Sequence, residues 1–451
     1  MDKVVTVKRV VCITYYFPPL VGIASARAAA FSKHLADLGW GPVVVAPRAG
    51  HYHRAGAAIH PIALQGDKVG ALVVRTRSVE LSRMLRAGHA LASGRELPRA
   101  EFTLQPVTTG SVMTRIRGFV REWLYVPDAQ VGWIPFAARA AANALCDAPG
   151  RRVLFSSSGP FSAHFAARRV ARRLNVPWVA EFRDPWTDDR SPNRARSRLR
   201  REVDRHLERE ILRKADHVVV PTESMRRLLL DRLPGPATTE ISVVRNGFEP
   251  TEVVAPPKGH EVMTLLYAGS VAAGENMGPV LSALDDVHRS HPGRFRLHVL
   301  GPGEGWEDTA HLSWLQLDGI VSPDDARQAM AGSSVLLLVQ QHPAYWLAVP
   351  GKAYEYVGVR RPILAVIPRG SEMERIVSSH ADARVVDLAA TAELPAAMED
   401  LLAEHRAGHL QGPRVQTSVT KPLLRLEQAR ELARIFERVG NQRTEAETPS
   451  V

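Results

Sequence analysis

Short apolar runs alternate with helix-forming segments along nearly the whole chain, and the alternation forms two successive series. The first series opens with a β-branched run over 4–14, a helix-forming segment over 24–38 and an apolar run over 42–46. Its later predicted strands cover 153–157, 177–182, 217–220 and 241–244, and its later helices cover 162–174, 198–214 and 222–230. Strands that alternate with helices form parallel sheets, so the pattern predicts an α/β fold.

The second series begins at Met263, after a stretch over 249–262 whose Pro and Gly content is typical of an interdomain linker. Its predicted strands cover 265–268, 296–300, 334–339 and 363–366, and its predicted helices cover 279–289, 323–330 and 351–359. We expect an N-terminal domain over 1–248, a C-terminal domain over 263–422, a long helix over 423–440 and a frayed tail over 441–451. Ligands of such folds bind at the carboxyl ends of the strands.

Charge and cysteine content limit the classes of function that this chain can have. Lys and Arg total 58 against 47 for Asp and Glu, and the net charge of +11 fits either anionic partners or a solvated basic surface. Cys12 and Cys146 are too few for a disulfide framework or a Cys-based metal site, which favours a reducing cytoplasm. Residues 332–351, within the longest uncharged run, contain Pro343 and Pro350, so we expect no transmembrane helix, and the charged first residues predict no signal peptide.

Several motifs of well-defined chemistry are missing from the sequence. It contains no GxxxxGK[ST] phosphate loop, no HExxH, no CxxC and no compact cluster of Asp, Glu and His. It also has no zinc finger, helix-turn-helix or RNP pattern. We therefore expect no bound metal and no nucleic-acid partner.

Three loops that follow predicted strands of the first series hold the polar residues expected at a binding site. The first places Gly22 ahead of a helix N-terminus, where backbone N–H groups bind anions. The second crowds hydroxyl groups beside His164, and the third places Arg183 and Asp184 directly after a strand. The structural alternatives are an ordinary glycine turn, a packed histidine and an Arg183–Asp184 ion pair that holds a turn.

In the second series, Lys352 and Glu355 lie three residues apart at the start of the predicted helix 351–359, so they share one face of its first turn. An ammonium group beside free helix N–H groups suits a diphosphate, and a nearby carboxylate can accept two ribose hydroxyls. The alternative is a plain surface pair at this spacing.

Seven segments form a more specific signal when they are taken in their order along the chain. They are YYFPPLVGIASARAAAFSKHLADLGW (15–40), YVPDAQVGW (125–133), SSSGPFSAHFAA (156–167), PWVAEFRDPWTD (177–188), RNGFEP (245–250), LLYAGS (265–270) and PGKAYEYVGVRRPILAV (350–366). With these segments the chain resembles bacterial glycosyltransferases of the GT-B fold, in the retaining family-four-like group.

This resemblance implies two Rossmann-like parallel-sheet domains that face a central cleft, with the C-terminal helix crossing back to the N-terminal domain. The C-terminal domain would bind a nucleotide-sugar and the N-terminal domain the acceptor. The sugar would move with retention of its anomeric configuration, without a metal and with no cofactor besides the nucleotide-sugar as co-substrate. The leaving phosphate would help to take the proton of the acceptor, so no separate nucleophile is expected.

The resemblance also implies roles for individual residues. Gly22 matches a loop that faces the donor phosphates, and His164 and Asp184, with Arg183 beside them, match positions near the acceptor and the transferred sugar. Lys352 matches a phosphate-facing position. The remaining donor-binding positions are Glu355, at the ribose, and Gly269, Ser270 and Gly301. Asn246 and Gly247 match the interdomain hinge.

The sequence departs from the family pattern at two positions. Leu347 lies eight residues before Glu355, where much of the wider family has a second Glu that contacts the sugar. Glu275 lies in a loop where relatives often have Arg or Lys for the diphosphate. Either Lys352 and the helix N-termini suffice for the diphosphate, or donor binding is weak.

Three hypotheses for function remain open at this point. The first is transfer to a lipid-linked glycan or to a cell-envelope or exopolysaccharide precursor, as in polysaccharide biosynthesis. The second keeps the donor and moves the sugar to a soluble natural product. The third is a catalytically weak homologue that serves as a binding subunit of a glycan-assembly complex, which Glu275 and Leu347 favour.

Two basic segments favour a peripheral position at the inner face of the plasma membrane. The segment 113–125 has the pattern of an amphipathic helix with Trp and Phe on its apolar side. The segment 190–214 is strongly basic, with Arg198, Arg200 and Arg201 among its cations. The alternative is a helix that packs on the domain core and an arginine run that is solvated.

Overall fold

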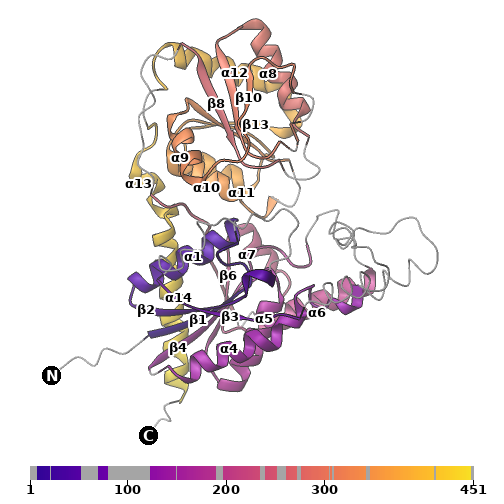
Figure 1. Ribbon diagram of the computed structural model, residues 1–451, viewed down its shortest axis with the longest axis vertical. Helices are drawn as coiled ribbons and strands as arrows, with labels where there is room; N and C mark the ends of the chain where they lie inside the picture. Colours follow the sequence, from indigo (N-terminus) through magenta and orange to yellow (C-terminus); the bar gives the residue numbers. More distant parts are fainter. Residues whose placement is uncertain are drawn as a thin grey trace, which may run out of the picture. The chain divides into compact units, whose positions relative to one another are not determined.

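The structure is a computed structural model, which describes residues 8–20, 22–51, 70–79, 122–148, 150–188, 197–233, 239–250, 261–271, 276–303, 305–306, 309–341, 346–410 and 413–447. The chain forms two compact units. Unit 1 comprises residues 1–245 and 428–451, and unit 2 comprises residues 246–427. Each unit combines a central sheet with covering helices (Figure 1).

Unit 1 is built on a seven-stranded parallel sheet. Its strands are β1 (Lys8–Thr14), β2 (Trp40–Pro47), β3 (Leu72–Thr76), β4 (Arg151–Ser157), β5 (Trp178–Glu181), β6 (His217–Val220) and β7 (Glu240–Val243). Their order is β3-β2-β1-β4-β5-β6-β7, so the direction of winding reverses between β1 and β4. The loops that leave the carboxyl ends of these two strands diverge, and open α/β sheets bind ligands at such a switch point.

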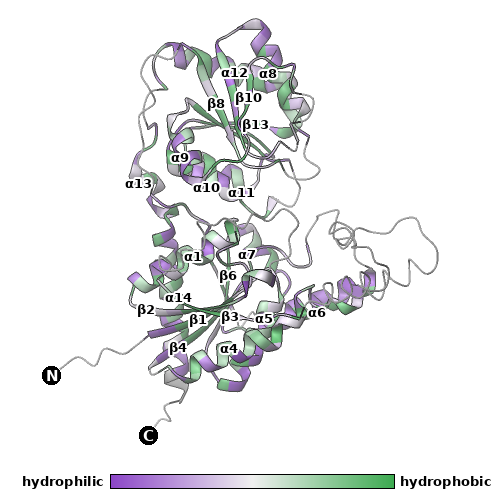
Figure 2. Cartoon of the chain, viewed as in Figure 1, coloured by the Kyte–Doolittle hydropathy of each residue, from purple (hydrophilic) through white to green (hydrophobic). Residues whose placement is uncertain are grey.

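Helices cover both faces of the unit 1 sheet. α1 (Ile23–Asp37) and α14 (Arg425–Glu447) share one core with alternate residues of β1, β2 and β4. α4 (Ile134–Cys146) and α5 (Ser162–Leu174) contact β1 from the other face. α6 (Arg198–Lys214) contacts α5, and α7 (Glu223–Leu230) contacts β6 and β7. After their first residues, the central strands β1 and β4 are mainly hydrophobic (Figure 2), as strands buried on both faces must be.

The C-terminal helix α14 completes the core of unit 1. Phe436 is fully buried, and its ring makes edge-on contacts with Trp40 and Phe155 at centroid distances of 5.4 and 5.5 Å. The other buried residues of this stripe are Ala429, Leu432, Ala433, Ile435 and Val439. The prediction that the last helix crosses back to the N-terminal domain is confirmed.

The predicted frayed tail over 441–451 is wrong as far as Glu447, because α14 continues to that residue. Gly440 allows the helix to approach β4 closely, since a Cβ there would lie 2.9 Å from Cδ of Arg151. Arg443 then donates hydrogen bonds to Asn175 at 2.8 Å and to Asp216 at 3.1 Å. These contacts with unit 1, rather than a hydrophobic stripe, hold the last turns.

Unit 2 is built on a six-stranded parallel sheet in the order β10-β9-β8-β11-β12-β13. Its strands are β8 (Met263–Ala268), β9 (Phe295–Leu300), β10 (Leu315–Leu317), β11 (Val335–Val339), β12 (Ile363–Ile367) and β13 (Ala383–Asp387). α8 (Gly278–Ser290) and α12 (Leu394–Arg406) pack in the core of one face. α9 (Pro323–Gly332), α10 (Gly351–Val359) and α11 (Glu372–His380) pack on the other, and the short α13 (Thr417–Thr420) precedes the return of the chain to unit 1.

The predicted fold class, two parallel-sheet α/β domains, is confirmed. Four elements have the predicted bounds: α5, α6, β6 and α10. The strands that the sequence does not predict, β3, β10 and β13, all lie at sheet edges, where partial exposure weakens the apolar pattern.

Most of the predicted linker, and the amphipathic helix as far as residue 121, lie outside the described residues. Among the described helices, none is long and apolar enough to span a bilayer.

Replacing Phe436 with Ala should lower the free energy of unfolding of unit 1 by about 3–5 kcal/mol, because it removes a buried aromatic ring. Urea unfolding followed by tryptophan fluorescence measures this loss. Arg434→Ala, whose side chain is 66% exposed on the same helix, is the control and should change the free energy by less than about 0.5 kcal/mol. A loss below about 1 kcal/mol in Phe436→Ala would contradict the packing of α14.

Candidate functional site

A buried ion pair lies at the carboxyl edge of the unit 1 sheet. Glu181 ends β5, and Arg27 lies in the second turn of α1. Arg27 donates to Oε1 of Glu181 from Nε at 2.9 Å and from Nη2 at 2.7 Å, and the side chains are 6% and 2% exposed. Ser157, at the end of β4, donates from its hydroxyl to Oε2 of Glu181 at 2.6 Å. The pair therefore joins α1, β4 and β5 beside the switch point.

Arg27 also holds the chain where it leaves β7. Its guanidinium donates to the carbonyl oxygens of Val244 at 2.8 Å and Arg245 at 2.5 Å. Each charge of this pair thus has several partners, which a buried charge requires. Sequence reasoning missed the pair, although both residues lie in quoted segments, because they are 154 positions apart. The available signal was an arginine early in the first helix and a glutamate at a strand end.

His164 lies in the first turn of α5 and is fully buried. Its Nδ1 shares a hydrogen bond with the Ser156 hydroxyl at 2.8 Å, and Nε1 of Trp178 donates to that hydroxyl at 2.8 Å. The imidazole packs on Phe182 at a centroid distance of 4.7 Å. Burial, with a smaller contribution from the charge of Arg183, lowers the pKa of His164 to about 3. The ring is therefore neutral, and its Nε2 has no hydrogen-bond partner among the described residues.

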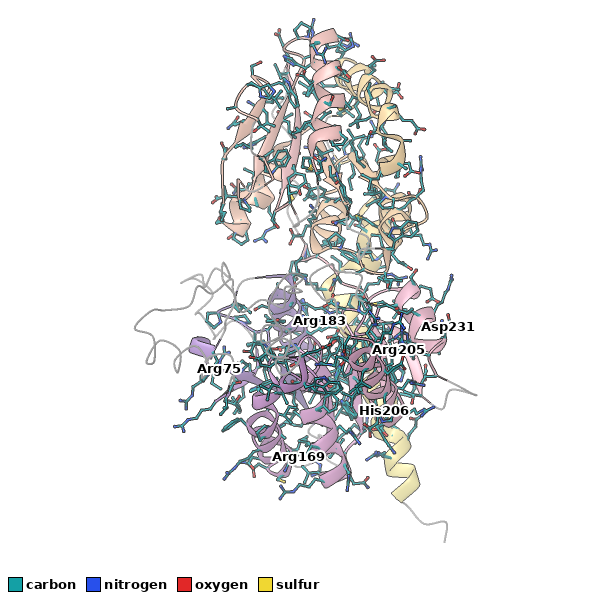
Figure 3. The ribbon with its side chains drawn as sticks, turned by 90° about the vertical axis from the view of Figure 1, so that its right-hand side faces the viewer. Arg75, Arg169, Arg183, Arg205, His206 and Asp231 are labelled. Atoms are coloured by element: carbon teal, nitrogen blue, oxygen red, sulfur yellow. The ribbon has the colours of Figure 1, made fainter. Side chains whose placement is uncertain are left out.

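Arg183 and Asp184 follow β5 at the same edge, and Arg183 is labelled in Figure 3. Arg183 donates to the carbonyl oxygens of Ser158 and Gly159, and its guanidinium lies 5.8 Å from the centroid of the Tyr16 ring. Burial lowers the pKa of Arg183, while the charge of Asp184 opposes this shift. Asp184 is exposed, and no ion pair joins these two described residues. Arg183 braces the loops after β1 and β4, whereas the Asp184 carboxylate is open to a ligand.

Gly22 precedes the first turn of α1, and its backbone has a φ of +139°, which favours glycine. A Cβ at this position would have no heavy atom within 4 Å, so the surroundings of Gly22 are open. The first turn of α1 contains no acidic residue. An open helix N-terminus of this kind can receive an anion.

The segment that precedes α4 supports the start of α5. Asp128 accepts hydrogen bonds from the backbone N–H of Ser162 at 2.8 Å and from its hydroxyl at 2.6 Å. Burial raises the pKa of Asp128, and these hydrogen bonds oppose that shift. The first turn of α5, which holds His164, is thereby tied to the YVPDAQVGW segment.

Arg200 of α6 holds the same segment from its other side. It is 2% exposed and donates to the carbonyl oxygens of Tyr125 and Pro127, both at 2.9 Å. It also pairs with Asp204 at 2.9 Å. The prediction that Arg200 belongs to a basic membrane-facing surface is therefore wrong, because its buried guanidinium donates hydrogen bonds to acceptors inside unit 1.

The carboxyl edge of the unit 2 sheet brings together most of the predicted donor-binding residues. Gly269 and Gly301 follow the neighbouring strands β8 and β9, with φ of +119° and +158°. A Cβ on Gly301 would lie 2.2 Å from the carbonyl oxygen of Gly269, so the two loops touch through backbone. A Cβ on Gly269 would lie 3.7 Å from Cδ of Lys352, which places the first turn of α10 against the same loops.

Lys352 is oriented by Tyr267, the penultimate residue of β8. Its Nζ donates to the Tyr267 hydroxyl at 2.8 Å and lies 4.4 Å from the ring centroid. The hydroxyl in turn donates to the carbonyl oxygen of Ser270 at 3.0 Å. Tyr267 is fully buried and was not predicted as a site residue, because its aromatic side chain suits an ordinary core strand. The ammonium group, the glycine loops and the helix N-terminus form one cationic edge.

Glu355 lies one turn further along α10 and is partly buried. Burial raises the pKa of its carboxyl, and the charges of Arg425 and Arg327 oppose the shift. None of the described residues gives this carboxyl a hydrogen bond. Leu347, also partly buried, lies before α10, whereas Glu275 lies outside the described residues.

Asn246 and Gly247 begin unit 2, at the predicted hinge. A Cβ on Gly247 would lie 2.5 Å from the carbonyl oxygen of Leu423, which leaves room only for glycine. Phe248 then forms a parallel β-bridge with Leu424. Backbone hydrogen bonds at this bridge join the segment that enters unit 2 to the segment that leaves it. The ring of Phe248 occupies the space that a side chain on Gly358 of α10 would need.

The predicted residues thus fall into two groups, one at the carboxyl edge of each sheet. Unit 1 contributes Gly22, His164, Arg183 and Asp184, of which His164 is buried. Unit 2 contributes Gly269, Ser270, Gly301, Lys352 and Glu355. Within the described ranges, no group of three or more His, Cys, Asp or Glu side chains could hold a metal ion.

Comparisons with known proteins agree with this arrangement. Residues 94–252 match the model of the family described as Glycosyltransferase Family 4. No curated protein sequence matches the chain. Over these residues, the match agrees with the resemblance to family-four-like glycosyltransferases that was drawn from the sequence.

Solved structures of low sequence identity share the GT-B fold. Sucrose-phosphate synthase from Thermosynechococcus elongatus is 12% identical, with a TM-score of 0.57 over 97% of this chain and 98% of that chain. The Anabaena protein HepE, in complex with UDP-glucose, is 10% identical, with a TM-score of 0.58 over 95% and 99%. The lipopolysaccharide outer core galactosyltransferase WaaB is 12% identical, with a TM-score of 0.54 over 95% and 99%. These likenesses concern the fold alone.

The stability of unit 1 should fall at acidic pH because His164 must become charged on unfolding. Its pKa rises from about 3 in the folded state to 6.5 when exposed, so the stabilisation is complete above pH 6.5 and is lost as the pH falls toward 3. At 1.4 kcal/mol per pH unit, the loss between pH 6.5 and pH 5 is about 2 kcal/mol.

Urea unfolding at both pH values should show that His164→Asn lacks this share of the pH dependence. His311→Asn, at an exposed position of unit 2, is the matched control and should keep the wild-type dependence. An unchanged pH dependence in His164→Asn would show that the imidazole is accessible to protons in the folded state.

Proposed function

We propose that this protein is a retaining glycosyltransferase that moves a sugar from a nucleoside-diphosphate sugar to a lipid-linked glycan or to a cell-envelope or exopolysaccharide precursor. The observation on which the proposal depends most is the cationic edge of unit 2, where Lys352 meets the glycine loops after β8 and β9. The family match supports the reaction class. HepE, with its UDP-glucose, supports a nucleotide-sugar as donor.

Lys352 is suited to a diphosphate because its position is set before any donor binds. Tyr267 fixes the ammonium group by a hydrogen bond and through its ring, and backbone-lined loops lie beside it. Glycines permit phosphate oxygens to approach backbone, and the N-terminus of α10 adds its partial positive charge. A preorganised cation loses little side-chain entropy on binding, which offsets the small number of charges at this edge.

Glu355 is suited to the two hydroxyls of a ribose. Its carboxyl is partly buried without a described hydrogen bond, an arrangement that costs free energy unless a ligand supplies donors. Arg425 and Arg327 favour its charged form, in which both oxygens accept hydrogen bonds. A bound nucleoside would therefore satisfy a group that the folded protein leaves open.

The unit 1 edge supplies positioning rather than a strong base. With a pKa of about 3, His164 is a poor proton acceptor at neutral pH. The exposed Asp184 carboxylate can orient hydroxyls of the transferred sugar or of the acceptor. The proton of the acceptor would then go to the leaving phosphate of the donor, as the family resemblance implies, with no metal required.

A lipid-linked or envelope acceptor fits the basic character of the chain, whose net charge is +11. WaaB, a lipopolysaccharide galactosyltransferase with the same fold, makes this class of acceptor a natural choice. The protein would then work in the cytoplasm, at the inner face of the plasma membrane. Transfer that proceeds with a water-soluble acceptor and without lipid would favour a soluble natural product instead.

Replacing Lys352 with Ala, or Glu355 with Ala, should weaken donor binding about tenfold to a hundredfold, because each change removes a charged hydrogen bond worth about 1.5–3 kcal/mol. Isothermal titration of UDP-glucose and other nucleotide-sugars measures the Kd. Lys421→Ala and Glu399→Ala, at exposed positions of unit 2, are the charge-matched controls and should leave the Kd unchanged. An unaltered donor Kd in both site variants would contradict the assignment of the donor site to this edge of unit 2.

Asp184→Asn should lower turnover strongly and leave the donor Kd nearly intact, because Asp184 lies in unit 1 and its carboxylate is exposed to the acceptor side. Steady-state kinetics of sugar transfer, with the donor Kd measured in parallel, separates the two effects. Asp147→Asn, also exposed in unit 1, is the control. Normal turnover in Asp184→Asn, or a matching loss of donor affinity, would contradict this role.

A further inference from the structure

Four exposed arginines lie together on the outer surface of unit 1, outside the site described above. Arg139 belongs to α4, and Arg169, Arg172 and Arg173 belong to α5. None of them has a hydrogen bond or an ion pair with a described residue. The neighbouring Arg168, in contrast, pairs with Glu210 of α6. We call the four unpaired residues the α4/α5 arginine face.

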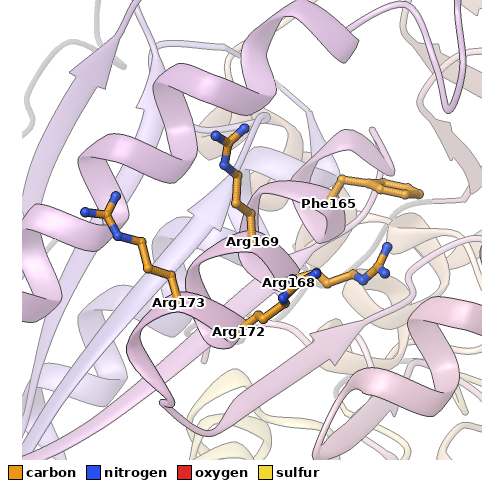
Figure 4. A pocket seen from close by; sticks show the side chains of 5 residues that line it. All are labelled: Phe165, Arg168, Arg169, Arg172 and Arg173. Carbon is orange, nitrogen blue, oxygen red and sulfur yellow. The ribbon is translucent and has the colours of Figure 1, made fainter.

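Two hollows run through this face. One, of about 490 Å³, is lined by Phe165, Arg168, Arg169, Arg172 and Arg173 (Figure 4). The other, also of about 490 Å³, is lined by Pro135, Ala138, Arg139, Ala142, Asn143, Arg169, Val170 and Arg173. They share Arg169 and Arg173, and neither has an acidic residue in its lining. Indeed, neither α4 nor α5 contains an Asp or a Glu, so their surface attracts anions without internal competition.

The side chains spread outward and do not converge on one point. In Figure 4, Arg169 and Arg173 extend to one side of α5, whereas Arg168 and Phe165 extend to the other. Arginines that bind a single phosphate converge on it with paired N–H groups. A spread of unpaired cations over apolar hollows fits many phosphates on a plane, with apolar groups beneath them.

The arginine face is separate from the candidate site, and α5 connects the two. Arg183 and Arg169 lie toward opposite ends of unit 1 (Figure 3). α5 begins at the carboxyl edge of the sheet with Ser162, and at 1.5 Å per residue Arg169 and Arg173 lie about 10 to 16 Å further along its axis.

We propose that the α4/α5 arginine face docks unit 1 on the anionic surface of a phospholipid bilayer. The choice of a bilayer as the partner depends on the lipid-linked acceptor of the proposed function. The cationic character of the face is independent of that function. Docking at this face differs from the surface predicted over 113–125 and 190–214, of which Arg200 is buried.

Sedimentation of the full chain with vesicles tests this proposal. Wild-type protein should pellet with phosphatidylcholine vesicles that contain phosphatidylglycerol, remain in the supernatant with phosphatidylcholine alone, and dissociate at high salt. The triple variant Arg169→Gln, Arg172→Gln, Arg173→Gln should partition about a hundredfold less, since each arginine near such a surface contributes about 1 kcal/mol.

A second triple variant with the same loss of charge serves as the control. Arg289→Gln, Arg369→Gln and Arg375→Gln change side chains of unit 2 that are 68%, 51% and 50% exposed. This variant should bind vesicles within about threefold of wild type, because its substituted side chains do not belong to the α4/α5 arginine face. Thermal unfolding and donor affinity should be unchanged in both variants, so a failure of the donor assay would count against the proposed function and not against docking.

Three results would overturn the proposal. Wild-type protein that stays in the supernatant with anionic vesicles at low salt would exclude docking. Equal losses of vesicle binding in the two triple variants would show that binding depends on net charge and not on the α4/α5 arginine face. Stabilisation by soluble inorganic diphosphate that depends on Arg169, Arg172 and Arg173, without vesicle binding, would assign the face to a free phosphate compound.

Discussion

The buried ion pair between Arg27 and Glu181 holds the carboxyl edge of the unit 1 sheet together. The Arg27 guanidinium donates hydrogen bonds to the Glu181 carboxylate at the end of β5 and to the backbone after β7. The hydroxyl of Ser157, at the end of β4, donates to the other oxygen of the same carboxylate. A buried ion pair adds little net stability, but loss of one partner would strand a charge at a cost of about 3–5 kcal/mol. Such a pair therefore fixes one arrangement of loops rather than merely strengthening the fold.

The two units provide different kinds of edge. In unit 1, Arg183 and Arg200 donate hydrogen bonds to backbone carbonyls and His164 is neutral and buried, whereas the Asp184 carboxylate is exposed. In unit 2, two glycine loops touch through backbone, Tyr267 orients Lys352, and the Glu355 carboxyl has no hydrogen bond from a described residue. This difference agrees with a donor that is bound by charge and an acceptor side that selects by shape and by single hydroxyl contacts.

The sequence predicted the buried strands well, and it placed Lys352 and Glu355 on one helix correctly, because both depend on local patterns. Apolar runs bounded by turns gave the central strands, and the spacing of Lys352 and Glu355 on one helix gave two residues that lie at one edge. Edge strands such as β10 were missed because only part of each is buried. The frayed tail was wrong because Gly440 and Arg443 contact unit 1 residues that no local pattern identifies.

The site in unit 1 was harder to predict, since its geometry depends on partners far apart in the chain. Nothing near Arg27 in the sequence indicates Glu181 as its partner, and nothing near Arg200 indicates the carbonyls of the 122–127 segment. His164 was correctly placed after a strand, but burial and its bond to Ser156 are properties of the packed sheet and helix. Burial of a charged side chain is a tertiary property, which composition and periodicity do not contain.

The most direct test of this account is the transfer reaction itself, followed by mass spectrometry and NMR with purified protein, a set of nucleoside-diphosphate sugars and polyprenyl-diphosphate-linked glycans. The account predicts that one donor is consumed, that its nucleoside diphosphate is released in step with a glycosylated lipid, and that the new linkage keeps the anomeric configuration of the donor. Transfer with inversion would contradict the retaining mechanism. Absence of binding and turnover with every donor would contradict the assignment as an active glycosyltransferase.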